Sequence, residues 1–443
     1  MIRISGGDAV KIAARFVKGK KPLNEAEERK AALCKIVDTD GTVLDEALVT
    51  VFRAPRSYTG EDVVEISCHG SEALCREILR LSFGFGAEQA TAGEFTRRAF
   101  SAGKLTLTEA ESVIDLIDSK SRAAIALSRK NLDGALSHEI DKIYQKLRST
   151  LGSVYAGIDF PDEDLETMSD GDMAKSISEA RDMISNLQNS YKSGHAVFEG
   201  IPTVICGKPN VGKSTILNAL LGEERAIVTD IPGTTRDVVS ECAVVGDVTL
   251  NIRDTAGIRD TSDGIEKIGV SRSIGEIEKC ELIIGVYDMS RPYDCDDKTV
   301  TELLLSAKND GKSIITIFNK CDLERRFDFE NCGVDIRTLG KSVDLCARSE
   351  KAKEKLSDTI NGMFIDGGIF ERGEAVVSNA RQHASLARAE SLCADALNSL
   401  RSFGAETAGM DIERAMSELA RLDGREVGVD IVNDIFGRFC VGK

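Results

Sequence analysis

Residues Gly207-Lys208-Pro209-Asn210-Val211-Gly212-Lys213-Ser214 match the pattern G-x-x-x-x-G-K-[ST]. The apolar run Thr203–Cys206 before them is expected to form a strand, and Ser214–Leu221 after them a helix, which is the setting that a phosphate-binding loop requires. In such a loop the backbone N–H groups surround the phosphates, Lys213 neutralises the β and γ groups, and the Ser214 hydroxyl binds Mg²⁺. The predicted nucleotide contacts here are Asn210, Val211, Gly212, Lys213, Ser214 and Thr215. The alternative, a glycine-rich turn that binds nothing, is much weaker.

Two further motifs follow in the order that a guanine-nucleotide switch requires. Asp254-Thr255-Ala256-Gly257 comes after the apolar run Val248–Ile252, which places a carboxylate near Mg²⁺ and a glycine amide near the γ-phosphate. Asn319-Lys320-Cys321-Asp322 comes after the run Ile314–Phe318. A carboxylate there can accept two hydrogen bonds from the N1 and N2 edge of guanine, which adenine cannot offer. The sequence therefore predicts a GTPase.

A polar loop between the first two motifs has the composition of a switch segment. It reads Thr229-Asp230-Ile231-Pro232-Gly233-Thr234-Thr235-Arg236-Asp237. A threonine here can bind Mg²⁺ and sense the γ-phosphate, although an ordinary Gly/Pro loop is an open alternative. Ras-like enzymes carry a water-orienting glutamine directly after D-x-x-G, whereas this chain has Ile258 there. Isoleucine cannot orient water, so another polar side chain must do so. The nearby acids are Asp260, Asp263 and Glu266.

The hydrophobic pattern changes along the chain and indicates several domains. Short apolar runs (Ile2–Ile4, Val63–Ser67) with glycine turns predict a small α+β domain over residues 1–105. Strands that alternate with helices over 200–368 predict a doubly wound, mostly parallel sheet of the Ras type. Helical patterns fill 106–199 and 369–443, so the α/β domain is interpreted as inserted into a helical domain.

Local signals predict where the helices begin and end. A capping box at Thr108–Glu111 opens the helical region. A helix over Met173–Tyr191 is expected to stop at Gly194, and a final helix to begin at Asp411 and stop near Gly424. An apolar face that is expected to pack on the earlier helical half comprises Leu386, Ala389, Cys393, Ala396, Leu397 and Leu400.

The composition favours a cytoplasmic protein that does not coat nucleic acid. The chain has 443 residues and a net charge of −16, and phosphate neutralisation needs clustered Lys and Arg. RNA is not excluded as a substrate. No apolar run reaches membrane-spanning length, and the twelve cysteines contain no C-x-x-C pair.

The chain resembles the MnmE (TrmE) family of bacterial tRNA-modification GTPases over nearly its whole length. The segments that carry the resemblance are Ile2–Gly6, Thr59–Glu65, Gly93–Phe100, the switch residues Gly233–Asp237 and the terminal Phe439-Cys440-Val441-Gly442-Lys443. The last segment is the most diagnostic of them.

The resemblance implies roles for further residues. K⁺ would be held by Asn210, Thr229, Ile231 and Thr234, and Mg²⁺ by Ser214 and Thr235. Glu266 would orient the attacking water, and Cys346-Ala347-Arg348 would replace the usual S-A-[KR] guanine loop. 5-Formyltetrahydrofolate would contact Arg3, Glu65, Lys104 and Lys443 at a homodimer interface. Cys440 lies in the same terminal motif, where a catalytic thiol and a packed cysteine are equally open.

The family activity would be K⁺-dependent GTP hydrolysis coupled to building a carboxymethylaminomethyl group on carbon 5 of the tRNA wobble uridine. The FAD-dependent partner MnmG would share the work in a heterotetramer. The family usually has a Gly- and Pro-rich stretch before Ile2, so the first strand of the N-terminal sheet is expected to be missing. The main alternative is a ribosome-assembly GTPase of the Era/Der type, although neither a second phosphate-binding loop nor a KH-like G-x-x-G follows Asp366. A folate-binding protein with an inactive G domain is a third reading, which the intact Lys213, Asp254 and Asp322 oppose.

Overall fold

The computed structural model describes residues 1–159, 168–221, 241–253, 278–365, 375–426, 428–439 and 442. It contains two compact units, each assembled from separate stretches of chain. The first comprises Met1–Ile114, Leu132–Tyr144 and Glu413–Lys443, and the second comprises Asp115–Asn131 and Gln145–Ile412. The predicted boundaries at 105, 199 and 368 stay a prediction.

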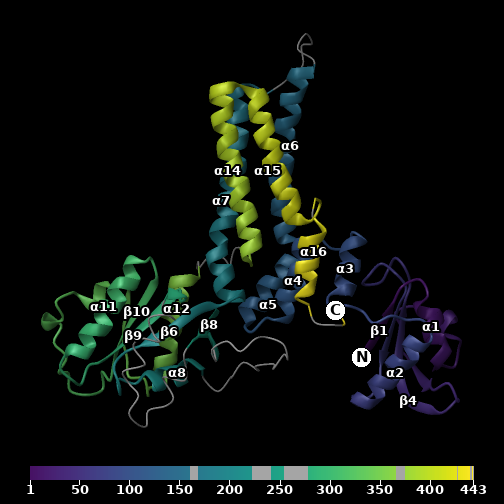
Figure 1. Cartoon of the computed structure of the whole chain (residues 1–443), viewed down its shortest axis with the longest axis horizontal. Coiled ribbons are helices and arrows are strands. Elements are labelled where there is room, and N and C mark those ends of the chain that lie inside the picture. Colours follow the sequence, from purple (N-terminus) through teal and green to yellow (C-terminus); the bar gives the residue numbers. More distant parts are fainter. Residues whose placement is uncertain are drawn as a thin grey trace. The chain divides into compact units, whose positions relative to one another are not determined.

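Figure 1 follows the chain through its helices and strands. Up to residue 199 these are β1 (Ile2–Ser5), α1 (Ala9–Phe16), β2 (Val17–Lys18), η1 (Leu23–Glu25), β3 (Ala32–Val37), β4 (Val43–Phe52), β5 (Val63–Ser67), α2 (Glu72–Gly84), α3 (Glu94–Ser101), α4 (Leu107–Ile117), α5 (Arg122–Leu132), α6 (Ala135–Asp159) and α7 (Asp170–Phe198). Thereafter they are β6 (Ile201–Cys206), α8 (Lys213–Leu221), β7 (Glu241–Val245), β8 (Val248–Ile252), β9 (Leu282–Asp288), α11 (Cys295–Asn309), β10 (Ser313–Asn319), η2 (Glu330–Cys332), η3 (Ile336–Thr338), β11 (Lys341–Asp344), α12 (Lys351–Phe364), α14 (Ala380–Phe403), α15 (Ala405–Asp423) and α16 (Val429–Gly437).

The first unit contains an antiparallel sheet in the order β1-β5-β4-β3-β2. Side chains alternate along β1, so Ile2 and Ile4 are buried while Arg3 and Ser5 face the other side and are half-buried. The buried face packs on α1 and α2 around Phe16. The strands expected at Ile2–Ile4 and Val63–Ser67 are confirmed, and β1 lies at an edge of this sheet.

The second unit contains a mixed sheet in the order β11-β10-β9-β6-β8-β7. Only β7, at the edge, runs antiparallel to its neighbour among these six strands. Apolar clusters cover both faces of the sheet, and β9 is buried along its whole length. The predicted doubly wound α/β sheet is confirmed, and the phosphate-binding loop follows its inner strand β6.

Helices α7 and α14 pack against each other in the second unit, side by side in Figure 1. Five of the six residues of the predicted apolar face of α14 are buried, and Leu397 is half-buried. Arg181 of α7 pairs with Glu390 of α14 at 3.3 Å. The expected packing of the C-terminal helical part on the earlier one is therefore confirmed for these two helices.

Two predicted helix starts, at Thr108 and at Asp411, are wrong. The capping box of α4 is formed by Thr106 and Glu109, where Thr106 Oγ1 accepts from the N–H of Glu109 at 3.2 Å and Glu109 Oε2 accepts from the N–H of Thr106 at 2.9 Å. Thr108 lies inside the helix and donates to Asp423 at 3.3 Å. Asp411 lies inside α15, where it accepts from Ser399 Oγ at 2.7 Å. The stop near Gly424 is confirmed, but α16 follows and is the last helix.

Helix α7 does not end at Gly194 but continues to Phe198. A Cβ atom at Gly194 would lie 2.0 Å from the carbonyl oxygen of Val377 and 2.9 Å from Val376 Cγ1. Glycine is therefore present because another segment passes close to the helix. The helix ends before Gly200, whose φ is +81°.

Candidate functional site

The loop after β6 can be formed only with glycine at two positions. Gly207 has φ +155°, and a Cβ atom there would lie 2.6 Å from the carbonyl oxygen of Val286. Gly212 has φ +102°, and a Cβ atom there would lie 2.3 Å from Asn319 Nδ2. The backbone thus passes close to the neighbouring strands β9 and β10. A side chain at either glycine would fill the space that shapes the loop.

Lys213 folds back over this loop from the first turn of α8. Its Nζ donates to the carbonyl oxygens of Gly207 at 2.8 Å and Lys208 at 3.0 Å. Ser214 and Thr215, which follow in the same turn, are half-buried. A hydroxyl beside a loop lysine at a helix N-terminus fits the oxygen ligation that Mg²⁺ prefers. Burial raises the pKa of the adjacent Cys206 thiol to about 12, so this cysteine is a neutral packing group.

Because β6, β9 and β10 are parallel, their carboxyl ends bring the Asn319–Asp322 motif to the same edge of the sheet as the phosphate-binding loop. Asn319 Nδ2 donates to the carbonyl oxygen of Val211 at 2.8 Å, and its Oδ1 accepts from the N–H of Ala347 at 2.9 Å. Asn319 is 3% exposed. A single buried amide therefore connects the phosphate-binding loop to the predicted guanine loop at Cys346–Arg348.

Lys320 makes a second connection between the same motifs. It has φ +63°, and its Nζ donates to the carbonyl oxygen of Asn210 at 2.9 Å and to Asp288 Oδ2 at 2.6 Å. Burial opposes ionisation of Asp288, but donation from Lys320 and from Ser290 lowers the pKa of that carboxyl below its usual value. The ammonium is therefore held by a charged partner.

Asp288 is a site residue that the sequence analysis did not single out. It ends the buried strand β9, and Ser290 donates to its Oδ1 from both N–H (3.0 Å) and Oγ (2.6 Å). Its position could have been predicted from the sequence, because an acid at the carboxyl end of an apolar strand in a doubly wound sheet lies at the edge where ligands bind. Its partner, Lys320, could not have been predicted in this way.

The remaining described residues of the predicted nucleotide site line the same edge. Asp322 is exposed in the turn after Lys320, which is closed by a hydrogen bond from the N–H of Leu323 to the carbonyl oxygen of Lys320 at 3.1 Å. Asn210 is exposed with φ +61°, whereas Val211 is buried. Cys346 is half-buried and Arg348 is exposed.

Many predicted site residues lie outside the described ranges. Within residues 200–368 these are Thr229, Asp230, Ile231, Pro232, Gly233, Thr234, Thr235, Asp254, Thr255, Ala256, Gly257 and Glu266, and at the C-terminus they are Cys440 and Lys443.

In the first unit, Arg3 of the implied folate site lies beside Tyr58, Glu65 pairs with Arg3, and Lys104 lies beside the adjacent Ser57. Arg3 and Glu65 are paired across β1 and β5 and form an ion pair of 2.7 Å. The Arg3 guanidinium lies 5.6 Å from the centre of the Tyr58 ring. Lys104 donates to the carbonyl oxygen of Ser57. A pocket of about 570 Å³ is lined by Arg29, Phe52, Pro55, Arg56, Ser57, Tyr58 and Lys104.

Tyr58, Arg29 and Arg56 are therefore candidate binding residues that the sequence analysis missed. Tyr58 directly precedes the motif Thr59–Glu65, so the motif could have been extended by one position. The two arginines are separated along the chain, and local patterns did not bring them together.

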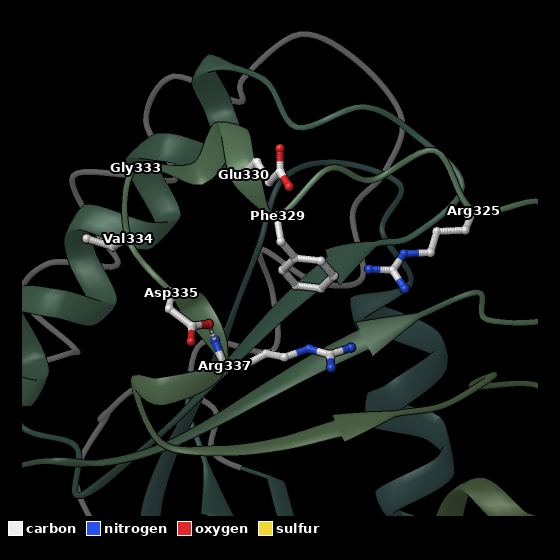
Figure 2. Close-up of a pocket in the computed structure, with 7 residues that line it drawn as sticks. All are labelled: Arg325, Phe329, Glu330, Gly333, Val334, Asp335 and Arg337. Atoms are coloured by element: carbon white, nitrogen blue, oxygen red, sulfur yellow. Dashed lines mark hydrogen bonds between the residues drawn. The ribbon is translucent and has the colours of Figure 1, made fainter.

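A second pocket, of about 580 Å³, lies in the other unit and is drawn in Figure 2. The Arg325 and Arg337 guanidinium groups lie close to the Phe329 ring, 4.9 and 4.7 Å from its centre. Glu330 and Asp335 add negative charge at its wall. Its described lining residues include none of the phosphate-loop or guanine-loop residues, so it does not form part of the candidate nucleotide site.

Comparison with known proteins agrees with this arrangement. A family model described as the MnmE helical domain matches residues 107–440, and one described as the GTP-binding protein TrmE N-terminus matches residues 1–104. The chain belongs to the MnmE (TrmE) family. Similar curated proteins are the tRNA modification GTPases MnmE of Clostridioides difficile and Natranaerobius thermophilus, each 37% identical, and that of Thermotoga maritima, 36% identical. Each alignment covers 100% of this chain and 96% of the relative.

Membership of the MnmE family is the resemblance expected from the sequence, and it is confirmed. The matches extend over both the N-terminal and the helical parts, so the Era/Der interpretation is not retained. In the part of the chain that the structure describes, no helix is long and apolar enough to cross a membrane.

Proposed function

We propose that this chain is a cytoplasmic GTPase of tRNA modification and that GTP binds at the edge of the mixed sheet formed by the phosphate-binding loop and the Asn319–Asp322 motif. The observation that carries the proposal is the pair of hydrogen bonds that Asn319 and Lys320 donate to the backbone of the loop. These hydrogen bonds hold a phosphate-binding element and a guanine-reading element in one fixed arrangement. Full-length similarity to proteins named tRNA modification GTPase supports the same activity.

Each described residue has a role in this proposal that follows from its position. Lys213, which the carbonyl groups of Gly207 and Lys208 position, would bind the β- and γ-phosphates. Ser214 and Thr235 would hold Mg²⁺, which would supply positive charge against the phosphate oxygens. Water attacks the γ-phosphorus, and GDP leaves with the β–γ bridging oxygen.

A bound K⁺ would supply positive charge near the transferred phosphoryl group, as an arginine finger does in other GTPases. Asn210 has an exposed side chain at the tip of the loop, which suits a cation ligand. Thr229, Ile231 and Thr234 complete the proposed set.

Replacing KCl by NaCl at equal ionic strength is expected to lower kcat for GTP hydrolysis by about 10²-fold, the loss typical of removing one preorganised charge contact. The measurement is phosphate release at saturating Mg²⁺ and GTP. An Asn210→Ala variant should lose the difference between the two salts. Equal rates of the unmodified protein in both salts would show that K⁺ does not bind at Asn210.

The proposed product is a carboxymethylaminomethyl group on carbon 5 of the wobble uridine, built with an MnmG-like FAD protein and a 5-formyltetrahydrofolate donor. The cations around Tyr58 suit an anionic, aromatic ligand of this kind. A homodimer and a heterotetramer with the partner belong to the same proposal.

Lys104→Ala and Arg3→Ala are each expected to weaken 5-formyltetrahydrofolate binding by about 10- to 100-fold, because each removes a charged donor. Calorimetric titration measures the dissociation constant. Lys18→Ala is the matched control, since Lys18 lies in β2 at the other edge of the same sheet. Unchanged folate affinity in both site variants would reject this location for the donor.

A further inference from the structure

Lys208, the second residue of the phosphate-binding loop, points away from the loop toward the N-terminus of α11. Its Nζ donates to Asp294 Oδ2 at 2.8 Å and to Asp297 Oδ2 at 2.6 Å. The Lys208 side chain is 7% exposed and that of Asp297 is 2% exposed. A lysine in the variable part of a phosphate-binding loop is expected to be solvated, so this burial requires a reason.

The two aspartates are already committed to the start of α11. Asp294 Oδ1 accepts from the N–H groups of Asp296 at 3.1 Å and Asp297 at 3.2 Å, and Asp297 Oδ2 accepts from the N–H of Asp294 at 3.2 Å. This reciprocal capping box fixes both carboxylates relative to the helix. Lys208 is therefore bound to a rigid point rather than to a mobile side chain.

The charge of Lys208 is maintained by this environment. Burial alone would lower the pKa of Lys208, but its hydrogen bonds and charge interactions with the two carboxylates raise it above the usual value. Asp297 Oδ1 is buried without a hydrogen-bond partner among the described residues. Loss of the ammonium would leave this carboxylate uncompensated in the interior.

The backbone of the same residue contacts the lysine that would bind phosphate. The carbonyl oxygen of Lys208 accepts from Lys213 Nζ at 3.0 Å. Residue 208 thus connects the capped N-terminus of α11, through its side chain, to the ammonium of Lys213, through its main chain. A shift of residue 208 would displace one of the two carbonyl groups that position Lys213.

We propose that Lys208 is a positioning residue of the nucleotide site, whose buried ammonium anchors the phosphate-binding loop to α11 and thereby sets the affinity for guanine nucleotides. This proposal rests on the proposed function of residues 207–214 as the GTP phosphate loop. It adds a residue that does not touch the nucleotide but preorganises the loop that does. Preorganisation lowers the ordering cost of binding, so its loss weakens binding without removing a ligand contact.

The test compares Lys208→Met with Lys298→Met, a matched control on the exposed side of α11. Lys208→Met is expected to raise the dissociation constants of GDP and GTP equally, each by at least about 10-fold. The rise is equal because the anchored backbone does not discriminate the γ-phosphate. In steady-state hydrolysis the loss falls mainly on KM, whereas a merely structural defect would lower the thermal midpoint and the active fraction. Wild-type dissociation constants in a folded Lys208→Met protein overturn the proposal.

Asp294→Asn decides the question if Lys208→Met does not fold. Asparagine keeps the capping oxygen of the half-exposed Asp294 but replaces the acceptor for Lys208, so a smaller rise in both dissociation constants is expected. An unchanged affinity rejects the anchoring role. Lys213→Ala tests nucleotide binding by the loop separately from the anchoring role of Lys208. If it retains nucleotide binding, the proposed function of the loop fails, whereas lost binding in Lys213→Ala with normal binding in the anchor variants rejects only the role of Lys208.

Discussion

An Asp322→Asn variant is expected to shift the preference of the protein from GTP toward XTP by about 10⁴-fold. In the proposed site the carboxylate of Asp322 would accept from N1–H and the 2-amino group of guanine, whereas an asparagine could accept from N1–H but would donate toward position 2. Xanthine has a carbonyl oxygen at position 2, which can accept a hydrogen bond from the asparagine N–H₂. Guanine has an amino group there, which is itself a donor and cannot accept that bond. A site built to satisfy a hydrogen-bonding edge discriminates strongly because mispairing leaves polar groups unsatisfied.

The structure supports the assignment of this role to Asp322 rather than to another acid of the same segment. Asn319 and Lys320 fix the start of the turn to the phosphate-binding loop, and Asn319 also holds the Cys346–Arg348 loop through Ala347. Asp322 is exposed at this junction. Competition titrations with GTP and XTP measure the shift, with Glu324→Gln as the control, since Glu324 pairs with Arg326 in the same segment. If Asp322→Asn bound GTP with unchanged affinity, the base would be read by a different residue.

The phosphate-binding loop and the sheet that carries it could be predicted because their signals are local. Glycines at 207 and 212, a lysine at 213 and apolar runs of strand length are all visible in short windows of sequence. The connections that hold the site together are not local. Asp288 and Lys320 meet across the neighbouring strands β9 and β10, and Lys208 reaches Asp297 in α11, the helix that follows β9. A pattern shows that such residues are charged, but tertiary structure decides their partners.

The errors at helix ends have the same physical origin. Glycine is a residue that often ends a helix, yet the helix continues past Gly194, and this glycine leaves room for the backbone of Val377. Thr108 has the spacing of a capping box, yet Thr106 and Glu109, two residues earlier, satisfy the free amides and Thr108 bonds to Asp423 instead. Where two local solutions are equivalent in sequence, packing selects one of them.

The implied folate site shows an intermediate case. The antiparallel register places Arg3 opposite Glu65, which follows once the two strands are known to pair. The contact of Tyr58 with Arg3 and the hydrogen bond from Lys104 to Ser57 both depend on the loop between β4 and β5, which contains Ser57 and Tyr58. No short sequence pattern specifies the path of this loop.

A Glu266→Ala variant is expected to lose about 10²–10⁴-fold in kcat for GTP hydrolysis, the contribution of a positioned acid–base group, while its affinity for GTP is retained. Ile258 occupies the position where Ras-like enzymes carry a water-orienting glutamine, so the polar group must come from further along the chain. Glu266 is the acid that matches the family pattern, although it lies outside the described residues. Affinity should persist because the phosphate loop, the hydrogen bond from Asn319 and Asp322 are all unchanged.

Single-turnover hydrolysis separates the loss of chemistry from any loss of binding, since it follows prebound GTP. Asp260→Ala and Asp263→Ala are the matched controls, because they remove acids of the same segment that have no assigned role. Glu266→Gln refines the result: a glutamine that supports substantial turnover would mean that the residue acts by orienting water, whereas loss equal to that of alanine would mean that its charge is required. Normal turnover in Glu266→Ala, together with a loss in either aspartate variant, would transfer the water-positioning role to that aspartate.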